Sequence, residues 1–396
     1  MLRRALPAAV AATLPLSAAA DTEVDVSGFI KLDAMATQYS AGAPGNALMD
    51  EFFVPSLIPT GADDEQVRYN SHARESRIRF TTDTDLDGHR LGTHLELDFM
   101  VTDVPGSDER ISNSNSPRVR HAFFTFDDFL FGQTWSTFYN VSSLPELNDF
   151  VGPVGTLFNR QPQVRYSADT SYGTWHVAVE NAESSLNDNG NINVTEADPT
   201  ARGYNPNARF VANAGGAPDL ALRYDLRSDA GSNVSLAVLG RQLAYEDADG
   251  DLETAYGGGV SLAGRLKVGS RDDFRFMANY GHLGRYLGLN AFAGGFVEDD
   301  GDINPTPVLG GLAAYRHFWT EGLRSTLSVS MAEADVEAAD VGGGEAERYA
   351  SAHLNLMYSP VDAATFGIEY SHAERVNIDD SDGTMQRLQF SAKYAF

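Results

Sequence analysis

The chain has 396 residues, a formal net charge of -26 at pH 7 and no cysteine. Without cysteine the sequence excludes disulfide frameworks, thiol nucleophiles and thiolate metal sites, and its acidic balance argues against nucleic acid as a partner. The mean hydropathy of -0.27 does not exclude a transmembrane β-barrel, because every second residue of a barrel strand faces the lumen.

An export signal is predicted over residues 1–20. Arg3-Arg4 precede an apolar run from Ala5 to Leu16, and Ala18-Ala19-Ala20 supply the small residues of a cleavage site. A transmembrane anchor is the alternative, but two prolines interrupt the run, which is shorter than the roughly 20 residues that a spanning helix needs. We therefore expect cleavage of this signal peptide and a mature barrel domain over residues 21–396.

Segments in which apolar and polar side chains alternate dominate the mature chain, as in strands with two different faces. About sixteen such segments are recognised by their period of two. The first five run near Val24–Ala36, Glu75–Thr82, Leu91–Phe99, Arg118–Phe126 and Phe129–Gln133. Short turns are predicted at 85–88, 127–128, 171–173, 228–232, 269–272, 320–322 and 359–362. Long connections are predicted at 41–70, 102–117, 182–218, 244–254, 283–310, 333–345 and 373–383.

This alternation of short and long connections is typical of outer-membrane barrels, which have short periplasmic turns and longer extracellular loops. We therefore predict an all-β fold, a 16-stranded antiparallel transmembrane β-barrel in the outer membrane of a Gram-negative bacterium, with both termini on the periplasmic side. A soluble propeller is the alternative. It would require a repeat of about forty residues, which the sequence does not contain.

The C-terminal segment, Met385 to Phe396, carries the strongest barrel signal. One face of this strand is apolar and ends on an aromatic residue, whereas the opposite face is polar and partly basic, with Arg387, Gln389, Ser391 and Lys393. The first face suits lipid and the second suits water. An amphipathic edge strand of a soluble protein is the alternative interpretation.

Basic residues in the predicted strands alternate with apolar ones and are therefore expected to face the lumen. A lumen lined with guanidinium groups concentrates anions, and arginine binds carboxylates through two parallel hydrogen bonds. The alternative is that each arginine pairs with a lumenal acid such as Glu96 or Asp98 and only holds the wall together. The expected pore residues are Arg77, Arg79, Arg118, Arg120 and Arg165, and the further lumen-lining basic residues are Lys31, Arg316, Arg348, Arg387 and Lys393.

The connection from Trp135 to Gln161 is too apolar for a solvated loop. We expect it to fold into the barrel and narrow the pore, with Glu146, Asp149 and Arg160 facing the basic wall. Packing against a neighbouring subunit is the alternative.

The run from Pro117 to Trp135, with RVRHAF leading into FGQTW, resembles the DcaP-like outer-membrane porins. Residues 159–166, NRQPQVRY, and residues 28–33, GFIKLD, are similar to the same family. The resemblance implies a sixteen-stranded trimeric porin whose third extracellular loop constricts the pore and whose substrates include small organic anions such as dicarboxylates. It also implies that Arg118, Arg120, Arg160 and Arg165 belong to the constriction. Some members carry an N-terminal coiled-coil extension, whereas strand one is expected here within a few residues of Asp21.

No cofactor and no enzymatic activity are expected, since no local motif assembles a catalytic serine, histidine and acid. Asp247–Asp251 and Glu298–Asp302 have the oxygen density that Ca²⁺ favours, but neither completes a twelve-residue EF-hand loop. Solvated acidic loops are the preferred interpretation, and weak Ca²⁺ binding, including bridges to lipopolysaccharide, is the alternative. The nine histidines are dispersed, and His121 is expected to face lipid.

The predicted function is a passive, anion-preferring channel. A structural or adhesive barrel with a blocked lumen is the alternative. The expected partners are outer-membrane lipid and lipopolysaccharide, small anionic solutes, and two further copies of the chain in a homotrimer. The small residues of Gly257–Gly264 suit either a tight subunit contact or barrel curvature.

Overall fold

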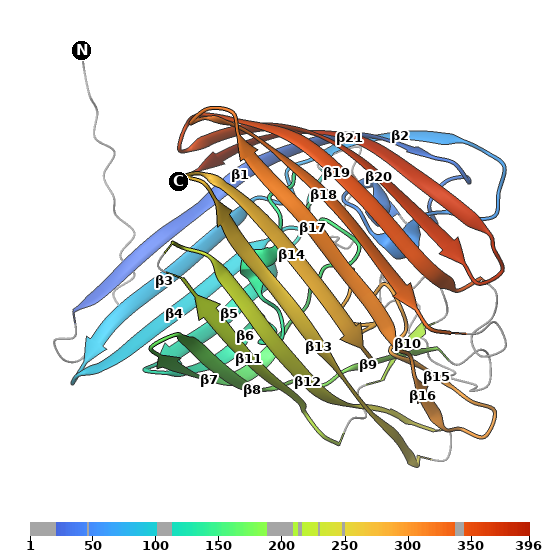
Figure 1. Cartoon of the computed structure of the whole chain (residues 1–396), viewed down its shortest axis with the longest axis horizontal. Helices are drawn as coiled ribbons and strands as arrows, with labels where there is room; N and C mark the ends of the chain where they lie inside the picture. Colours follow the sequence, from blue (N-terminus) through green and yellow to red (C-terminus); the bar gives the residue numbers. More distant parts are fainter. Residues whose placement is uncertain are drawn as a thin grey trace.

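The structure is a computed structural model that describes residues 21–45, 47–100, 113–187, 209–212, 216–228, 230–247, 250–336 and 344–396. The predicted signal peptide therefore lies outside the described residues. Within them, the wall is one closed antiparallel sheet with sixteen strand positions (Figure 1). The predicted architecture is thus confirmed.

The sheet closes because the first strand, β1 (Thr22–Tyr39), pairs with the last strand, β21 (Asp382–Ala395), and also with β3 (Arg77–Leu86). A short strand, β2 (Gln66–His72), pairs with the second half of β1. The strands β2 and β3 therefore occupy one position in the wall, and this position is longer than the predicted 75–82. Closure gives every described wall strand except β2 a partner on both sides, and such pairing is what a hydrocarbon environment requires.

The other wall strands follow in chain order, each paired with its predecessor. The first group is β4 (His89–Asp98), β5 (Arg118–Phe126), β6 (Phe129–Trp135), β7 (Arg160–Thr170), β8 (Gly173–Glu180), β11 (Asp219–Arg227) and β12 (Asn233–Glu246). The second group is β13 (Leu252–Val268), β14 (Asp272–Gly281), β17 (Val308–Phe318), β18 (Leu323–Ala334), β19 (Ala346–Val361) and β20 (Ala364–Asn377).

Two of the predicted long connections are in fact tight turns. The strand β12 ends at Glu246 and β13 begins at Leu252, and β20 ends at Asn377 and β21 begins at Asp382. Polar residues at these strand ends had the composition of loops, but backbone pairing continues through them. Composition is a poor guide there, because strand ends that project beyond the hydrocarbon layer have no need of an apolar face.

Smaller elements lie between the wall strands. A four-stranded sheet combines β9 (Ser184–Asn187), β10 (Arg209–Ala212), β15 (Gly295–Val297) and β16 (Ile303–Pro305). Three short 3-10 turns are η1 (Ala47–Asp50), η2 (Pro55–Leu57) and η3 (Val141–Ser143). No helix among the described residues is long and apolar enough to cross a membrane.

Alternation along each strand separates an apolar outer face from a polar inner face. In β21, Leu388 and Phe390 are 51% and 44% exposed, whereas the intervening Gln389 is only 3% exposed. The main buried cluster lies against the inner face and contains apolar residues of three connecting segments, 48–58, 138–158 and 283–292. On β13, a Cβ atom at Gly259 would come within 2.6 Å of the Leu283 side chain. This glycine therefore accommodates an interior segment.

Candidate functional site: the arginine-rich inner face of strands β3 to β7

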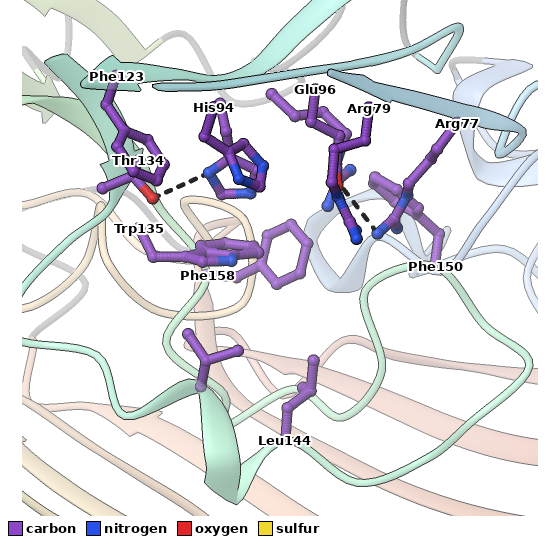
Figure 2. A pocket seen from close by; sticks show the side chains of 13 residues that line it. Arg77, Arg79, His94, Glu96, Phe123, Thr134, Trp135, Leu144, Phe150 and Phe158 are labelled. Carbon is purple, nitrogen blue, oxygen red and sulfur yellow. Dashed lines mark hydrogen bonds and ion pairs between the residues drawn. The ribbon is translucent and has the colours of Figure 1, made fainter. Parts of the chain in front are cut away.

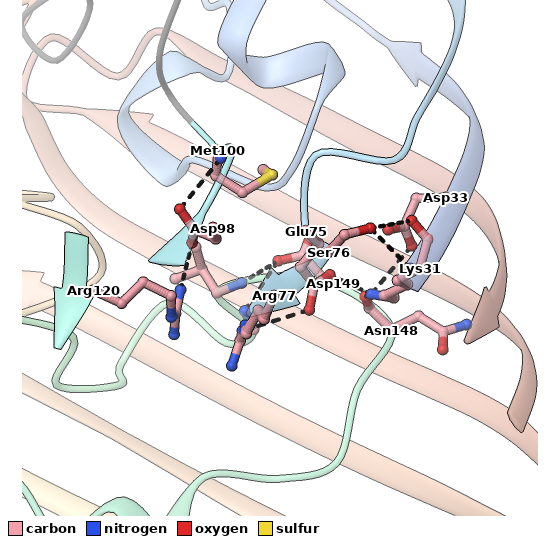
Figure 3. A network of polar contacts seen from close by, with 12 residues as sticks. Lys31, Asp33, Glu75, Ser76, Arg77, Asp98, Met100, Arg120, Asn148 and Asp149 are labelled. Atoms are coloured by element: carbon pink, nitrogen blue, oxygen red, sulfur yellow. Dashed lines mark hydrogen bonds and ion pairs between the residues drawn. The ribbon is translucent and has the colours of Figure 1, made fainter. Parts of the chain in front are cut away.

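The inner face of β3, β4 and β5 carries a network of paired charges. Both Nε and Nη2 of Arg79 donate to Glu96, at 3.0 and 2.7 Å. Arg118 donates to the two oxygens of Asp98 at 2.9 and 2.8 Å. Arg120 bridges both acids, with 2.8 Å to Glu96 and 2.7 Å to Asp98, the second of which can be followed in Figure 3. Three guanidinium groups thus share two buried carboxylates, so the acids compensate this cluster only in part.

A β-bulge in β5 places two consecutive side chains on the inner face. Glu96 of β4 is opposite His121 and Leu97 is opposite Val119, which leaves Arg120 as the extra residue. His121 is 8% exposed and shares a 2.9 Å hydrogen bond with the Thr134 hydroxyl. The prediction that His121 faces lipid is therefore wrong, because the bulge shifts the alternation by one residue.

The positive charge of two arginines beside this network is balanced less closely by carboxylates. Arg77 lies 3.6 Å from the nearest oxygen of Glu75 and 3.7 Å from that of Glu96. Arg160 has no ion pair among the described residues, and its Nη1 atom is buried without a hydrogen-bond partner. Its guanidinium group stacks over the Trp135 ring at 4.3 Å. Both groups keep hydrogen-bond donors that an anion can use.

Arg77, Arg79 and Arg120 line a cavity of about 380 Å³ between the wall and the connection from β6 to β7. We call residues 136–159 the β6–β7 segment. Figure 2 shows arginines and His94 along one side of the cavity and aromatic rings opposite them. The lining residues are Arg77, Arg79, His94, Glu96, Arg120, His121, Phe123, Thr134, Trp135, Val141, Leu144, Phe150 and Phe158. The cavity therefore offers cationic donors together with apolar ring surfaces.

Glu146 of the β6–β7 segment pairs with arginines on β17 and β18. Its carboxylate accepts from Arg316 at 2.9 Å and from Arg324 at 2.8 and 2.5 Å. Burial alone would raise the pKa of Glu146, but hydrogen bonds and charge from Arg324 and Arg316 outweigh burial and lower this pKa to about 2. Glu146 is thus ionised at neutral pH and contacts a different part of the wall from the β3–β7 arginines.

Asn148 ties the same segment to β1, β20 and β21. Its carbonyl oxygen accepts from Lys31 at 2.8 Å and from Gln389 at 3.2 Å, and its side-chain oxygen accepts from Ser391 at 2.9 Å. Its backbone N–H donates to Glu369 at 2.7 Å. Figure 3 shows Lys31 and Asn148 within this network. The segment therefore has fixed contacts with β1, β20 and β21, and β1 is the direct neighbour of β3 in the wall.

Comparison with known proteins places this architecture in a family. The sequence profile described as DcaP outer membrane protein matches residues 13–396. The chain belongs to the DcaP family. The expected resemblance is thereby confirmed, and the chain is an outer membrane channel protein by family.

Solved structures share the fold of this DcaP-family chain. The outer membrane channel DcaP of Acinetobacter baumannii is 24% identical, with a TM-score of 0.73, over 95% of this chain and 97% of that chain. An anion-selective porin from Comamonas acidovorans is 10% identical, with a TM-score of 0.56, over 95% and 100% of the two chains. OmpF of Salmonella typhi, in complex with daunomycin, is 10% identical, with a TM-score of 0.54, over 94% and 97%. No curated protein matches the sequence.

The remaining predicted basic residues of the DcaP-family chain have varied surroundings. Lys31 is buried and pairs with Glu75 and, at 3.2 Å, with Asp33. Lys393 lies over the Phe29 ring at 5.5 Å and forms no ion pair with any described residue. Only some of the predicted lumenal cations are therefore free to meet a solute.

Arg387 and Asp149 are fixed within the structure. Arg387 is 1% exposed, donates to Thr37 at 2.9 Å and to the Met49 carbonyl, and lies 3.6 Å from Asp149. Asp149 also accepts from the backbone N–H of Phe53 at 2.8 Å. Both residues hold connecting segments in place and do not line the arginine cavity.

Arg348 does not have the predicted lumenal position. Its side chain is 47% exposed and lies 4.0 Å from Glu374, whereas the next residue, Tyr349, is completely buried on the inner side. An irregularity in the pairing of β19 with β20 lies between Ala346 and Arg348. Pairing is regular from Arg348 through Leu356, so Arg348 lies on the same outer face as Leu354 and Leu356, which are 53% and 42% exposed.

One apolar connecting segment that is buried inside the barrel was not predicted from the sequence. Phe52 and Phe53, in the first long connection, are buried, and the Phe52 ring lies 5.4 Å from that of Phe150. The run FFVPSLI, residues 52–58, is as unsuited to a solvated loop as the β6–β7 segment. The same compositional signal would have identified it.

The acidic loops of this DcaP-family chain give no metal site in the part that the structure describes. No group of three or more histidine or acidic side chains there is arranged to hold a metal ion. Glu298–Asp302 forms the turn between β15 and β16, and Asp247–Asp251 lies partly outside the described residues. Weak divalent binding at these loops stays a prediction.

Proposed function

We propose that this chain is a porin that forms a water-filled, anion-preferring channel for passive diffusion of small organic anions such as dicarboxylates. The observation that carries the proposal is the excess of guanidinium groups on one inner face. Five arginines there surround three acids; Arg77 lies no nearer than 3.6 Å to a carboxylate, and Arg160 forms no ion pair with a described residue. The five are Arg77, Arg79, Arg118, Arg120 and Arg160, and the acids are Glu75, Glu96 and Asp98. A low-dielectric wall focuses this positive charge on passing solutes.

The β6–β7 segment is, in this proposal, the third extracellular loop, folded inward so that it narrows the channel. Its contacts with inner-face residues of β17, β18, β20 and β21 support this role. Glu146 and Asn148 hold the segment against one side of the wall, while Phe150 and Phe158 border the cavity beside the arginines. A solute would then pass between aromatic rings and guanidinium groups.

The proposal extends to export, membrane context and assembly. Membership in a family of outer membrane proteins agrees with a cleavable signal over residues 1–20 and with contact to lipid and lipopolysaccharide. The apolar outer face supports a lipid-embedded wall. We propose a homotrimer, as the family resemblance implies.

A structural barrel with a blocked lumen is the second candidate. The buried cluster formed by segments 48–58, 138–158 and 283–292 favours it, because these residues occupy part of the interior. Conductance of the purified protein in planar bilayers separates the two candidates. A blocked barrel carries no current, whereas a porin gives discrete steps.

Reversal potentials in a KCl gradient test the anion preference. We expect chloride to be preferred by the unmodified protein, and the double variant Arg77→Gln, Arg160→Gln to reduce the chloride-to-potassium permeability ratio several-fold, because it removes two weakly compensated cations beside the arginine cavity. Arg271→Gln is the matched control, since Arg271 is exposed in a turn and pairs with Glu321 at 2.9 Å. Cation selectivity of the unmodified protein would refute the proposal.

A further inference from the structure

A second cavity adjoins the arginine cavity and has a different lining. Its volume is about 300 Å³, and it shares Thr134, Trp135 and Val141 with the first cavity. Arg165 of β7 and Arg223 of β11 are its basic residues. No carboxylate of the described residues lines it, whereas Glu96 lines the first cavity. The arginines that the sequence grouped as one cluster therefore belong to two compartments, with Trp135 and Val141 between them.

Arg223 is ion-paired and hydrogen-bonded through its Nη atoms, although its buried Nε donates no hydrogen bond. Its Nε lies 2.9 Å from an oxygen of Asp225, and its Nη1 donates to the carbonyl oxygens of Thr137 at 2.9 Å and Tyr139 at 2.5 Å. Asp225 therefore neutralises its charge, and its donors hold the start of the β6–β7 segment. Arg223 shapes the second cavity without supplying a free charge.

Arg165 is the opposite case. It forms no ion pair or hydrogen bond with any residue that the structure describes, and its Nε atom is buried without a partner. Glu180, on the neighbouring strand, is occupied elsewhere, because it accepts from Ser136 at 2.7 Å and from the Thr137 N–H at 2.6 Å. A partly buried guanidinium group with unused donors is costly unless an acceptor reaches it. An anion that enters the second cavity meets this need.

We propose that the Arg165 cavity is a second oxyanion-binding site, which holds the carboxylate or phosphate head group of a permeating solute beside the arginine cavity. This inference rests on the proposed channel function and adds a separate binding position to it. Carboxylate and phosphate oxygens both match the planar fork of an arginine side chain. Two weak neighbouring sites allow a solute to bind and still leave, as conduction requires.

Inhibition of the chloride current by inorganic phosphate tests the site in the full-length protein. We expect Arg165→Gln to raise the phosphate concentration that halves the current by about tenfold, the effect of losing one charge-assisted hydrogen-bond pair.

Lys267→Gln is the matched control, because Lys267 on β13 lines neither cavity, and we expect less than a twofold change. Arg165→Lys keeps the charge but loses the planar guanidinium group, so its half-inhibiting phosphate concentration should lie between those of the unmodified protein and Arg165→Gln. This variant also shows whether a protein substituted at this position still folds. Malonate in place of phosphate shows whether the site favours phosphate over carboxylate.

The inference is overturned if Arg165→Gln behaves like the unmodified protein, or if Lys267→Gln weakens phosphate inhibition equally, since net charge alone would then explain the effect. Both outcomes leave an anion-selective channel intact. Loss of anion selectivity in the unmodified protein is instead a failure of the proposed function. The two failures are therefore distinguishable from the same set of bilayer recordings.

Discussion

At the scale of single residues, Glu146 is the side chain whose removal should be most informative. Its carboxylate is shared by Arg316 and Arg324, so Glu146→Gln leaves Arg324 without an acid among the described residues, whereas Arg316 keeps Asp273. We expect this variant to weaken docking of the β6–β7 segment by about 1–3 kcal/mol and to increase open-channel noise in single-channel recordings at pH 7. Glu298→Gln, in the exposed β15–β16 turn, is the control. Unchanged noise and conductance would show that Glu146 does not anchor the segment.

The pH dependence of this anchor follows from the same carboxylate. Because docking lowers the pKa of Glu146 from 4.5 to about 2, its stabilising effect is complete above about pH 4.5, declines as the pH falls below that value, and is lost below about pH 2. Recordings between pH 7 and pH 3 should therefore show noise that grows only below about pH 4.5 in the unmodified protein. In Glu146→Gln this acid-induced component should be absent. An equal acid response in both proteins would assign it to another group.

Residue-level prediction from alternation failed for two different reasons. Arg77 and Arg79 lie on the inner face, and β3 pairs regularly with β4. His121 is on the opposite face from that predicted because of the bulge in β5. Arg348 lies in a regularly paired stretch, on the face of the exposed Leu354, so there the assignment of the inner face was itself wrong. A bulge leaves no clear mark in a single sequence, since it depends on the partner strand.

At the scale of elements, the docking of the β6–β7 segment depends on a glycine in β20. A Cβ atom at Gly367 would come within 2.3 Å of the Asn148 side-chain oxygen and 2.5 Å of the Met357 sulfur. We expect Gly367→Ala to displace Asn148 at a cost of about 1–3 kcal/mol, which should lower the thermal unfolding midpoint and raise the mean conductance. Gly240→Ala is the control, because a Cβ atom there has no neighbour within 4 Å. Equal midpoints for the two variants would contradict this role.

Connecting segments were predicted well when their composition was distinctive. The apolar character of Trp135–Gln161 indicated burial, and Phe138 and Leu157 are completely buried. Their partners, such as Met277 on β14, are remote in sequence and could not be named in advance. Two tight turns were mistaken for long loops, since acidic strand ends resemble loops in composition.

At the scale of the whole molecule, the two charge populations occupy different places. The chain carries a formal charge of -26, yet the inner face of β3 to β7 holds more arginines than acids. Acidic residues concentrate in turns such as Glu298–Asp302. The closing pair of β1 with β21 was foreseeable from the alternating C-terminal segment. The division of the arginines between two cavities was not, because it depends on how the β6–β7 segment lies against the wall.

Ionic strength separates the influence of the inner arginines from that of the outer acids. The Debye length falls from about 10 Å at 0.1 M salt to about 3 Å at 1 M, so screening weakens fields that act across open water. If the inner arginines set selectivity, the chloride-to-potassium permeability ratio should exceed one at 0.1 M KCl and decrease several-fold towards one at 1 M. The double variant Arg77→Gln, Arg160→Gln should begin closer to one and change less, because two weakly compensated charges are gone. If the acidic turns dominate instead, the protein will be cation-selective at low salt and will lose that preference as salt is added. Reversal potentials measured at both salt concentrations decide between these two sources of the field.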